Sequence, residues 1–186
     1  MSVYANEQQD KFVAIDEAHA ALVRALVQSR KPRSVLELGF GAGASCRAIL
    51  EGLRFNAAPA SFTVVDNWFD WKGQPPEEIK KPEYNGVQFI TSGEYEYVSA
   101  CDRKYQFIFS DADHFRTQDW FELVYDKLLE PEGILIYHDV SNPKYFPNLL
   151  RLYSDSVRRN YHHMLFNYNS RRDEACDRGL LVIFKH

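Results

Sequence analysis

The stretch SVLELGFGAG, residues 34–43, indicates how the whole chain is built. Its first half, Ser34–Leu38, has the short apolar character of a buried strand, and glycines follow at once at positions 39, 41 and 43. Residues 45–53 then carry their apolar side chains at helical spacing. A strand, a glycine loop and a helix in this order predict the first βα unit of a parallel sheet.

The same alternation extends outward from this unit. Upstream, the apolar residues of 7–29 predict one helix, which Lys31-Pro32 ends. The segment 69–86 is rich in proline and lysine, so we expect it to be mostly irregular, with some helix in 76–81. Further strands are expected at 62–65, 87–90, 105–109, 134–137, 163–168 and 180–184, and further helices at 117–129 and 147–159.

These elements predict the α/β class: a three-layer α/β/α sandwich around a mostly parallel sheet of seven strands. The last two strands are joined only by the polar link 170–178, which is too short for a parallel crossover. We therefore expect this C-terminal pair to be antiparallel. The 186 residues fit one domain, with a helical N-terminal segment at 1–33 and an irregular insertion at 69–86.

Composition and charge exclude several classes of protein. With 45% hydrophobic residues the chain can bury a core, so it is not intrinsically disordered. The formal charge of −4 shows no basic excess, which argues against a nucleic-acid partner. No apolar run approaches the roughly 20 residues that span a bilayer. The first ten residues lack a signal-peptide pattern and the three cysteines lack metal-ligand spacing, so we expect a cytoplasmic protein.

Residues that follow the strands are the candidates for chemistry, because ligands bind at the carboxyl ends of an open parallel sheet. Almost all of the expected strand ends are polar, acidic or rich in glycine. In chain order these segments are 37–43, 66–68, 92–94, 111–114 and 138–139.

The glycine loop allows two kinds of cofactor. Gly39 and Gly41 fit a loose dinucleotide pattern, and the helix that follows offers free N–H groups to an anion. Glu37 argues against a dinucleotide, because its carboxylate would repel a pyrophosphate but not a cationic sulfonium amino acid. Asp66, roughly 20 residues past the loop, can accept hydrogen bonds from ribose hydroxyls in either case. The antiparallel strand pair at the C-terminus favours the sulfonium cofactor.

Five motifs together resemble those of class I S-adenosylmethionine-dependent methyltransferases. They are ELGFGAG at 37–43, VVDNW at 64–68, FIFSDADHF at 107–115, LLEPEGILIYHDV at 128–140 and GLLVIFK at 179–185. Among these enzymes the chain is most similar to the small-molecule O-methyltransferases of the catechol, caffeoyl-coenzyme A and sugar types. The resemblance runs from Val35 to Lys185 and implies a Rossmann-like fold and methyl transfer to a hydroxyl of a small molecule.

The resemblance also implies which residues bind S-adenosylmethionine. The glycines of the loop would wrap its methionine part, with Glu37 near the amino group and Asp66 on the ribose. Asn67 or Trp68, and Gly93 or Glu94, would lie near the adenine. The full set is Glu37, Gly39, Phe40, Gly41, Gly43, Ser45, Asp66, Asn67, Trp68, Gly93, Glu94 and Asp111.

A divalent metal ion, such as Mg²⁺ or Mn²⁺, is a second cofactor in the metal-dependent members of this group. The matching positions here are Asp111, His138 and Asp139, although the relatives often have Asp-Asn where this chain has His-Asp. An imidazole ligand favours a transition metal, or no metal, over Mg²⁺. The alternative is that His138 and Asp139 only cap their loop.

His114 is the candidate general base, because an imidazole titrates near neutral pH and can accept a hydroxyl proton as the methyl group moves. Its spacing after the DAD motif matches that of a Lys or His in related enzymes. Asp111 would assist as a catalytic residue through the metal, and Asp113 can orient the imidazole. The alternative is a solvated histidine at the start of a loop.

Two other functions remain open from the sequence. One is N-methyl or aminopropyl transfer on the same fold, and the other is cofactor binding without catalysis. The acceptor itself is not determined. Its cover would come from the helix at 7–29, from 69–86, from the loop 141–147 or from a second subunit in a homodimer. Aromatic walls could come from Trp68, Trp71, Phe115 and Tyr145, which could equally be packing residues.

Overall fold

A computed structural model describes residues 15–69, 72–141, 148–166 and 179–186, and the description below is confined to these ranges. They contain one seven-stranded sheet in the order β3-β2-β1-β4-β5-β7-β6. The strands are β1 (Ser34–Leu38), β2 (Ser61–Asp66), β3 (Val87–Thr91), β4 (Tyr105–Ser110), β5 (Leu129–His138), β6 (His162–Phe166) and β7 (Leu180–Phe184).

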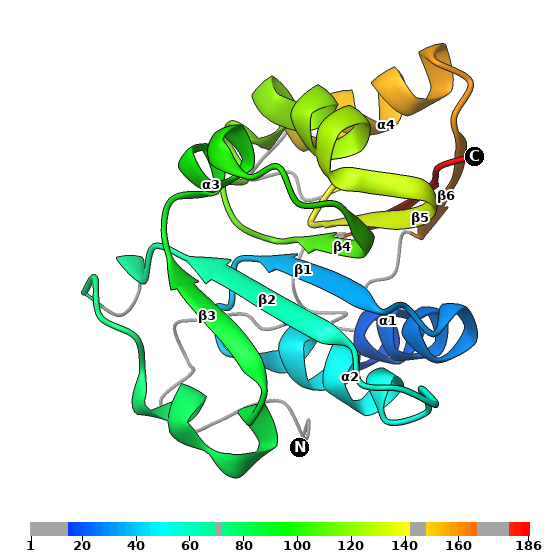
Figure 1. Cartoon of the computed structure of the whole chain (residues 1–186). Coiled ribbons are helices and arrows are strands. Elements are labelled where there is room, and N and C mark those ends of the chain that lie inside the picture. The colour runs from blue at the N-terminus through cyan, green and yellow to red at the C-terminus, as the bar shows by residue number, and fades with distance from the viewer. Residues whose placement is uncertain (1–14, 70–71, 142–147, 167–178) are drawn as a thin grey trace.

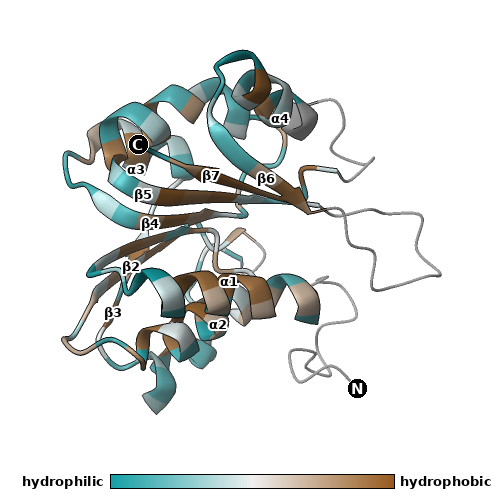
Figure 2. Ribbon diagram, turned by 90° about the vertical axis from the view of Figure 1, so that its right-hand side faces the viewer, coloured by the Kyte–Doolittle hydropathy of each residue, from teal (hydrophilic) through white to brown (hydrophobic). Residues whose placement is uncertain are grey.

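Helices cover both faces of the sheet. Figures 1 and 2 show α1 and α2 on one side, and α3 and α4 on the other. The α-helices are α1 (Glu17–Arg30), α2 (Ala44–Leu53), α3 (Glu94–Ala100) and α4 (Asn148–Arg158). Shorter elements are 3-10 turns at Glu77–Lys80, Pro82–Tyr84 and Thr117–Trp120, and a π-helical turn at Leu123–Leu128.

Alternation along the strands divides the core into two layers, since successive side chains point to opposite faces. Val35 of β1 packs in the layer that contains Val27 of α1. Its neighbour Leu36 packs in the layer with Val124 and Leu128 on the opposite face. Figure 2 shows the resulting hydrophobic strands between the two sets of helices. This arrangement confirms the three-layer sandwich that the alternating elements predict.

Among the described strands of the sheet, β7 alone runs against the direction of the others. β1 pairs in parallel with β2 on one side and with β4 on the other, and β5 continues the parallel part. β7 is antiparallel to both β5 and β6, which confirms the expected C-terminal pair. The chain leaves β1 toward β3 and then returns to β4, so the topological switch point lies between β1 and β4. The carboxyl ends of these two strands are therefore where a ligand is expected.

Several helical boundaries differ from the sequence prediction. The segment 94–100 forms α3 although Glu and Tyr alternate in it with the period of a strand, because acidic Glu94 and Glu96 favour a helix N-terminus and Val98 is buried. The expected helix at 117–129 is instead a 3-10 turn followed by a π-helical turn, and β5 begins as early as Leu129.

Other predicted boundaries fall partly beyond the described ranges. The helix predicted from residue 7 is described from Glu17, where Asp16 caps it, and residues 7–14 lie outside the described part. Pro147, residues 167–168 and the link 170–178 also lie outside it. Within the described ranges, no helix has both the length and the apolar character needed to cross a membrane.

Candidate active site

A pocket of about 450 Å³ opens at the carboxyl ends of β1 to β4. Eight of the residues that the sequence assigned to the cofactor or to catalysis line it, and they are Gly39, Gly41, Asp66, Asn67, Gly93, Glu94, Asp111 and His114. The pocket therefore joins the glycine loop to the segment that carries the candidate base. The volume is within the range of small-molecule sites, about 300–1,000 Å³.

The glycine loop is shaped for close approach of backbone. Gly39 has a φ of 91°, and a Cβ built there would lie 2.6 Å from the carbonyl oxygen of Asp111. Only glycine therefore allows the end of β1 to pack against the end of β4. A Cβ built on Gly41 would meet nothing within 4 Å, so the backbone at this position faces open space in the pocket.

Asp66 fastens this loop to the end of β2. Its Oδ2 accepts a hydrogen bond from the Phe40 backbone N–H at 2.7 Å, and its Oδ1 accepts one from the Trp68 N–H at 2.5 Å. A carboxylate has about four acceptor positions, so two bonds leave capacity for the hydroxyls of a ligand. Asp66 lines the pocket and has the position expected of a ribose-binding acid.

Glu37 lies beneath the loop rather than in the pocket wall. It is fully buried, its Oε1 accepts a hydrogen bond from the Ser45 hydroxyl at 2.5 Å, and its Oε2 has no hydrogen-bond partner among the described residues. Burial raises the pKa of Glu37 to about 8, although the bonds to Ser45 and Cys46 oppose the shift. The carboxyl is therefore mostly protonated at neutral pH.

Three other expected cofactor contacts are placed in the core. Phe40 and Trp68 are buried against each other, with ring centroids 5.9 Å apart, and the Trp68 indole N–H donates to Thr91 Oγ1 at 2.8 Å. Gly43 packs under the ring of Phe40. None of these three residues lines the pocket, and Ser45 does not line it either. Asn67 does line the pocket, as does the exposed ring of Phe69.

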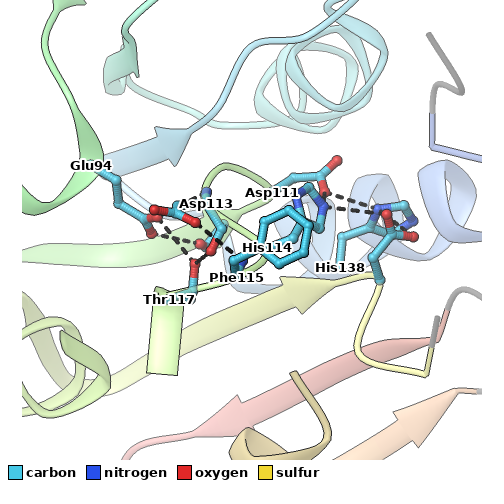
Figure 3. A network of polar contacts seen from close by, with 9 residues as sticks. Glu94, Asp111, Asp113, His114, Phe115, Thr117 and His138 are labelled. Atoms are coloured by element: carbon cyan, nitrogen blue, oxygen red, sulfur yellow. Dashed lines mark hydrogen bonds and ion pairs between the residues drawn. The ribbon is translucent and has the colours of Figure 1, made fainter. Parts of the chain in front are cut away.

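Four titratable side chains meet beyond the loop, at the ends of β4 and β5. His114 Nε2 lies 2.9 Å from Asp111 Oδ1 and 3.3 Å from Asp139 Oδ2. His138 Nδ1 lies 3.2 Å from the same oxygen of Asp111 and 3.6 Å from Asp139 Oδ1. Figure 3 shows the His114 and His138 rings on either side of the Asp111 carboxylate.

The cluster strongly shifts the pKa of two of its members. Burial alone would raise the pKa of Asp111, but His138 and His114 beside it hold this pKa far below its usual range. Burial would likewise lower the pKa of His114, but its bonds to Asp111 and Asp139 raise it to about 11. His114 is therefore an imidazolium at neutral pH, paired with two carboxylates.

The donor atoms of Asp111, His138 and Asp139 also fit a divalent cation. One ligand atom from each residue lies within 4.8 Å of the others, as the parallel pairing of β4 and β5 requires. Two carboxylates and one imidazole suit Mn²⁺, Fe²⁺, Co²⁺ or Zn²⁺ better than Mg²⁺, which prefers oxygen ligands only. The group thus has the composition of a mixed nitrogen and oxygen metal site.

The N-terminal helix contributes a residue that sequence reasoning missed. His19 of α1 is buried, its ring lies edge-on to His138 with centroids 5.4 Å apart, and its Nδ1 is 3.2 Å from Asp16 Oδ2. The sequence shows only that this histidine lies on the apolar face of a predicted helix. This pattern does not identify the strand end that the side chain contacts.

Pocket residues from the helical starts were also missed. Tyr95, Arg116 and Trp120 line the pocket, as does Phe69, which is 82% exposed. Tyr95 was overlooked because the start of α3 was not predicted. Trp71, Tyr145 and most of the loop 141–147, which were candidates for the cover, lie outside the described residues.

Solved structures with the same fold include several methyltransferases. An O-methyltransferase from Bacillus cereus in complex with SAH has a TM-score of 0.75 at 16% identity, covering 92% of this chain and 83% of that one. The O-methyltransferase TomG from Streptomyces achromogenes, involved in tomaymycin synthesis and solved with SAM, has a TM-score of 0.69 at 13% identity, covering 93% and 82%. SAH-bound methyltransferase PaMTH1 from Podospora anserina has a TM-score of 0.65 at 16% identity, covering 93% and 80%.

Sequence comparison identifies the family. No curated protein sequence matches the chain. Residues 36–140 match the family described as methyltransferase domain, and this range contains the glycine loop, Asp66 and the cluster at the ends of β4 and β5. The match spans more than half of the 186 residues. The chain therefore belongs to this family of methyltransferase domains.

Proposed function

We propose that this methyltransferase moves the methyl group of S-adenosylmethionine to a hydroxyl of a small-molecule acceptor. The observation that carries the proposal is His114, which lies in the wall of the same pocket as the glycine loop and between two carboxylates. Structures of the same fold that were solved with SAM or SAH support the choice of methyl donor.

The pocket suits a cationic nucleoside. Its lining contains the acidic residues Asp66, Glu94, Glu96, Asp111 and Asp113, against Arg116 and the His114 imidazolium. This excess of negative charge favours the positive sulfonium of S-adenosylmethionine over a pyrophosphate. In the proposed complex Asp66 accepts bonds from the ribose, Asn67 and Gly93 lie beside the adenine, and the backbone at Gly41 follows the methionine part.

Methyl transfer then requires alignment and removal of one proton. The pocket would hold the acceptor oxygen in line with the methyl carbon, and this alignment would lower the entropic cost of reaching the transition state. As the carbon–oxygen bond forms, the carbon–sulfur bond breaks with its electrons on sulfur, and the hydroxyl proton passes to His114. Asp111 and Asp139 would orient the imidazole throughout.

His114 can accept that proton only after losing its own. Its pKa of about 11 depends on its contacts with the carboxylates of Asp111 and Asp139. A second positive charge brought into the cluster repels the imidazolium and lowers this pKa. We propose that the sulfonium, or a metal cation, causes His114 to release this proton to solvent on entering the pocket, so that the neutral imidazole can accept the proton of the hydroxyl.

A divalent ion would be held by Asp111, His138 and Asp139. When bound there, it would lower the pKa of the acceptor hydroxyl and orient its oxygen. His114 remains the residue that takes the proton in this form of the enzyme as well.

We propose a small-molecule acceptor because the pocket is small and acidic, and a cytoplasmic location because the described cysteines, Cys46 and Cys101, are both free thiols. Phe115, next to His114 and 57% exposed, could cover one face of an acceptor.

The first experiment separates binding from turnover. Calorimetry with S-adenosylhomocysteine should give a micromolar complex, and methyl-labelled S-adenosylmethionine should label one class in a panel of catechols, phenols, sugars and primary amines. Labelling of a hydroxyl supports the proposal. Labelling of amines only, unaffected by chelator, would indicate an N-methyltransferase, and binding without any turnover would indicate a non-catalytic binding protein.

A further inference from the structure

One buried carboxylate contacts the base-bearing segment at three points. Glu94, the first residue of α3, is 8% exposed, and its Oε1 accepts a hydrogen bond from the Ser110 hydroxyl at 3.0 Å. Its Oε2 accepts from the Asp113 backbone N–H at 3.2 Å and from the Thr117 hydroxyl at 3.1 Å. Figure 3 shows the last two contacts beside His114.

These three contacts enclose the catalytic part of the chain. Ser110 ends β4 and Thr117 begins the following 3-10 turn, so Asp111 and His114 lie between two points that Glu94 holds. Within the segment, Asp113 Oδ1 accepts from the Phe115 N–H at 3.1 Å, and the Thr117 N–H donates to the Asp113 carbonyl at 2.9 Å. The conformation of the turn is thus stabilised by hydrogen bonds to Asp113 within the turn and by hydrogen bonds to Glu94 of α3.

Glu94 also belongs to the wall of the nucleoside pocket, between Gly93 and Tyr95. Because Glu94 contacts both the pocket and the turn at 110–117, a ligand that fills the pocket can change the geometry of this turn. The resemblance to O-methyltransferases implies only that Glu94 lies near adenine. Its three hydrogen bonds point to a different task.

We propose that Glu94 is a positioning residue: it fixes the turn that carries Asp111 and His114, and it tightens that turn when the nucleoside pocket is filled. The first part stands on the contacts of the protein alone, and the second rests on the proposed function. A residue that only contacts adenine would change cofactor affinity and leave the turn as it is.

Thr117 offers one pair of variants, because its hydroxyl lies 3.1 Å from Glu94 Oε2 and 2.5 Å from the Asp113 carbonyl oxygen, and its side chain does not line the pocket. Thr117→Val removes the hydroxyl at constant shape, and Thr117→Ser keeps it. Thr63→Val is the matched control, since Thr63 is a buried threonine on β2 outside the pocket lining. Glu94→Gln separates the two contacts of the Thr117 hydroxyl, because it weakens the acceptor at Glu94 and leaves the contact between Thr117 and the Asp113 carbonyl in place.

Amide hydrogen exchange of the protein without ligand tests the first part. We expect exchange in residues 110–117 to be about 10-fold faster in Thr117→Val and in Glu94→Gln, and close to wild type in Thr117→Ser and Thr63→Val. Equal exchange in all four variants would overturn the positioning role. Faster exchange spread evenly over the whole chain in Thr117→Val would overturn it too, since it would indicate a general loss of stability.

Two further measurements test the coupling. S-adenosylhomocysteine should slow exchange at 110–117 in wild type and much less in Thr117→Val. With catechol as the probe acceptor, Thr117→Val should lower kcat about 10-fold at nearly unchanged KM for S-adenosylmethionine, and Thr117→Ser should restore it. A changed KM with wild-type kcat would contradict the proposal. If wild type binds no S-adenosylhomocysteine, the proposed function fails while the first experiment still decides the role of Glu94.

Discussion

Individual side chains in this site are defined by burial and pairing as much as by type. Gly39, Gly41 and Asp66 could be placed at the pocket from the sequence, because each has a backbone or acceptor role that few residues can fill. Trp68 could not, because an aromatic residue after a strand has the same pattern whether it covers a ligand or fills the core. Its position depends on packing with Phe40, far away in the sequence.

The buried carboxyl of Glu37 predicts a pH-dependent stability. Its pKa is about 8 in the folded chain and near 4.5 when unfolded, so the unfolded state releases the proton first as pH rises. The free energy of unfolding should therefore fall between pH 5 and 8, by up to about 1.4 kcal/mol per pH unit. Glu37→Gln should remove the contribution of Glu37, whereas His114, whose pKa is raised from 6.5 to about 11, adds a fall of its own above about pH 6.5 in both proteins.

Urea unfolding at several pH values provides the measurement. Glu77→Gln, at a highly exposed carboxyl, is the control and should follow the wild-type curve. Parallel curves for wild type and Glu37→Gln from pH 5 to 8 would show that Glu37 is ionised in the folded chain.

Replacing His114 tests the proposed base. His114→Gln should lower kcat by about 100-fold or more, because general base catalysis contributes roughly that factor. The affinity for S-adenosylhomocysteine, measured by calorimetry, should change only a few-fold. His162→Gln, on the exposed edge strand β6, should leave both unchanged. A fully active His114→Gln variant would show that another group accepts the hydroxyl proton.

At the level of elements, strands were predicted more reliably than helices. Each predicted strand has a counterpart in the sheet, because short apolar runs between polar turns have few alternatives. The helix α3 was missed because its Glu-Tyr alternation favours a strand, and tertiary burial of Val98 outweighs that preference. The segment 117–128 is not a regular α-helix, because it consists of a 3-10 turn, where Thr117 contacts Glu94, and a π-helical turn that leads into β5.

The start of α1 predicts a local stability effect that reaches the site. Asp16 caps the helix by accepting from the His19 N–H at 2.9 Å, and it also pairs with the His19 ring beside His138. Asp16→Ala should lower the free energy of unfolding by about 1–2 kcal/mol. Glu17→Ala, at an exposed position of the same first turn, should cost less than about 0.5 kcal/mol. Similar urea midpoints for the two variants would contradict the capping role.

Across the whole molecule, the pocket is built from residues of several separate segments that only the sheet brings together. The sequence could predict this edge, because parallel strands align their carboxyl ends. It could not predict that α1 would bring His19 to His138, since no local pattern encodes a contact 119 residues apart along the chain.

A pocket assembled from so many segments predicts global stabilisation by its ligand. S-adenosylhomocysteine at 100 times its Kd should add about 2.7 kcal/mol to the free energy of unfolding. For a chain of this length, the melting temperature should rise by about 5–10 °C. Methionine alone, which lacks the nucleoside, should give a much smaller shift in the same thermal scan. Equal shifts in melting temperature with the two ligands would indicate that contacts to the nucleoside contribute little to binding.

The most direct measurement is a crystal structure of the complex with S-adenosylhomocysteine. We expect the ribose hydroxyls on Asp66, the adenine beside Asn67 and Gly93, and the sulfur on the side of the pocket that His114 lines. A nucleoside bound elsewhere, or a pocket closed by the side chains of the protein itself, would contradict the assignment of this site to methyl transfer.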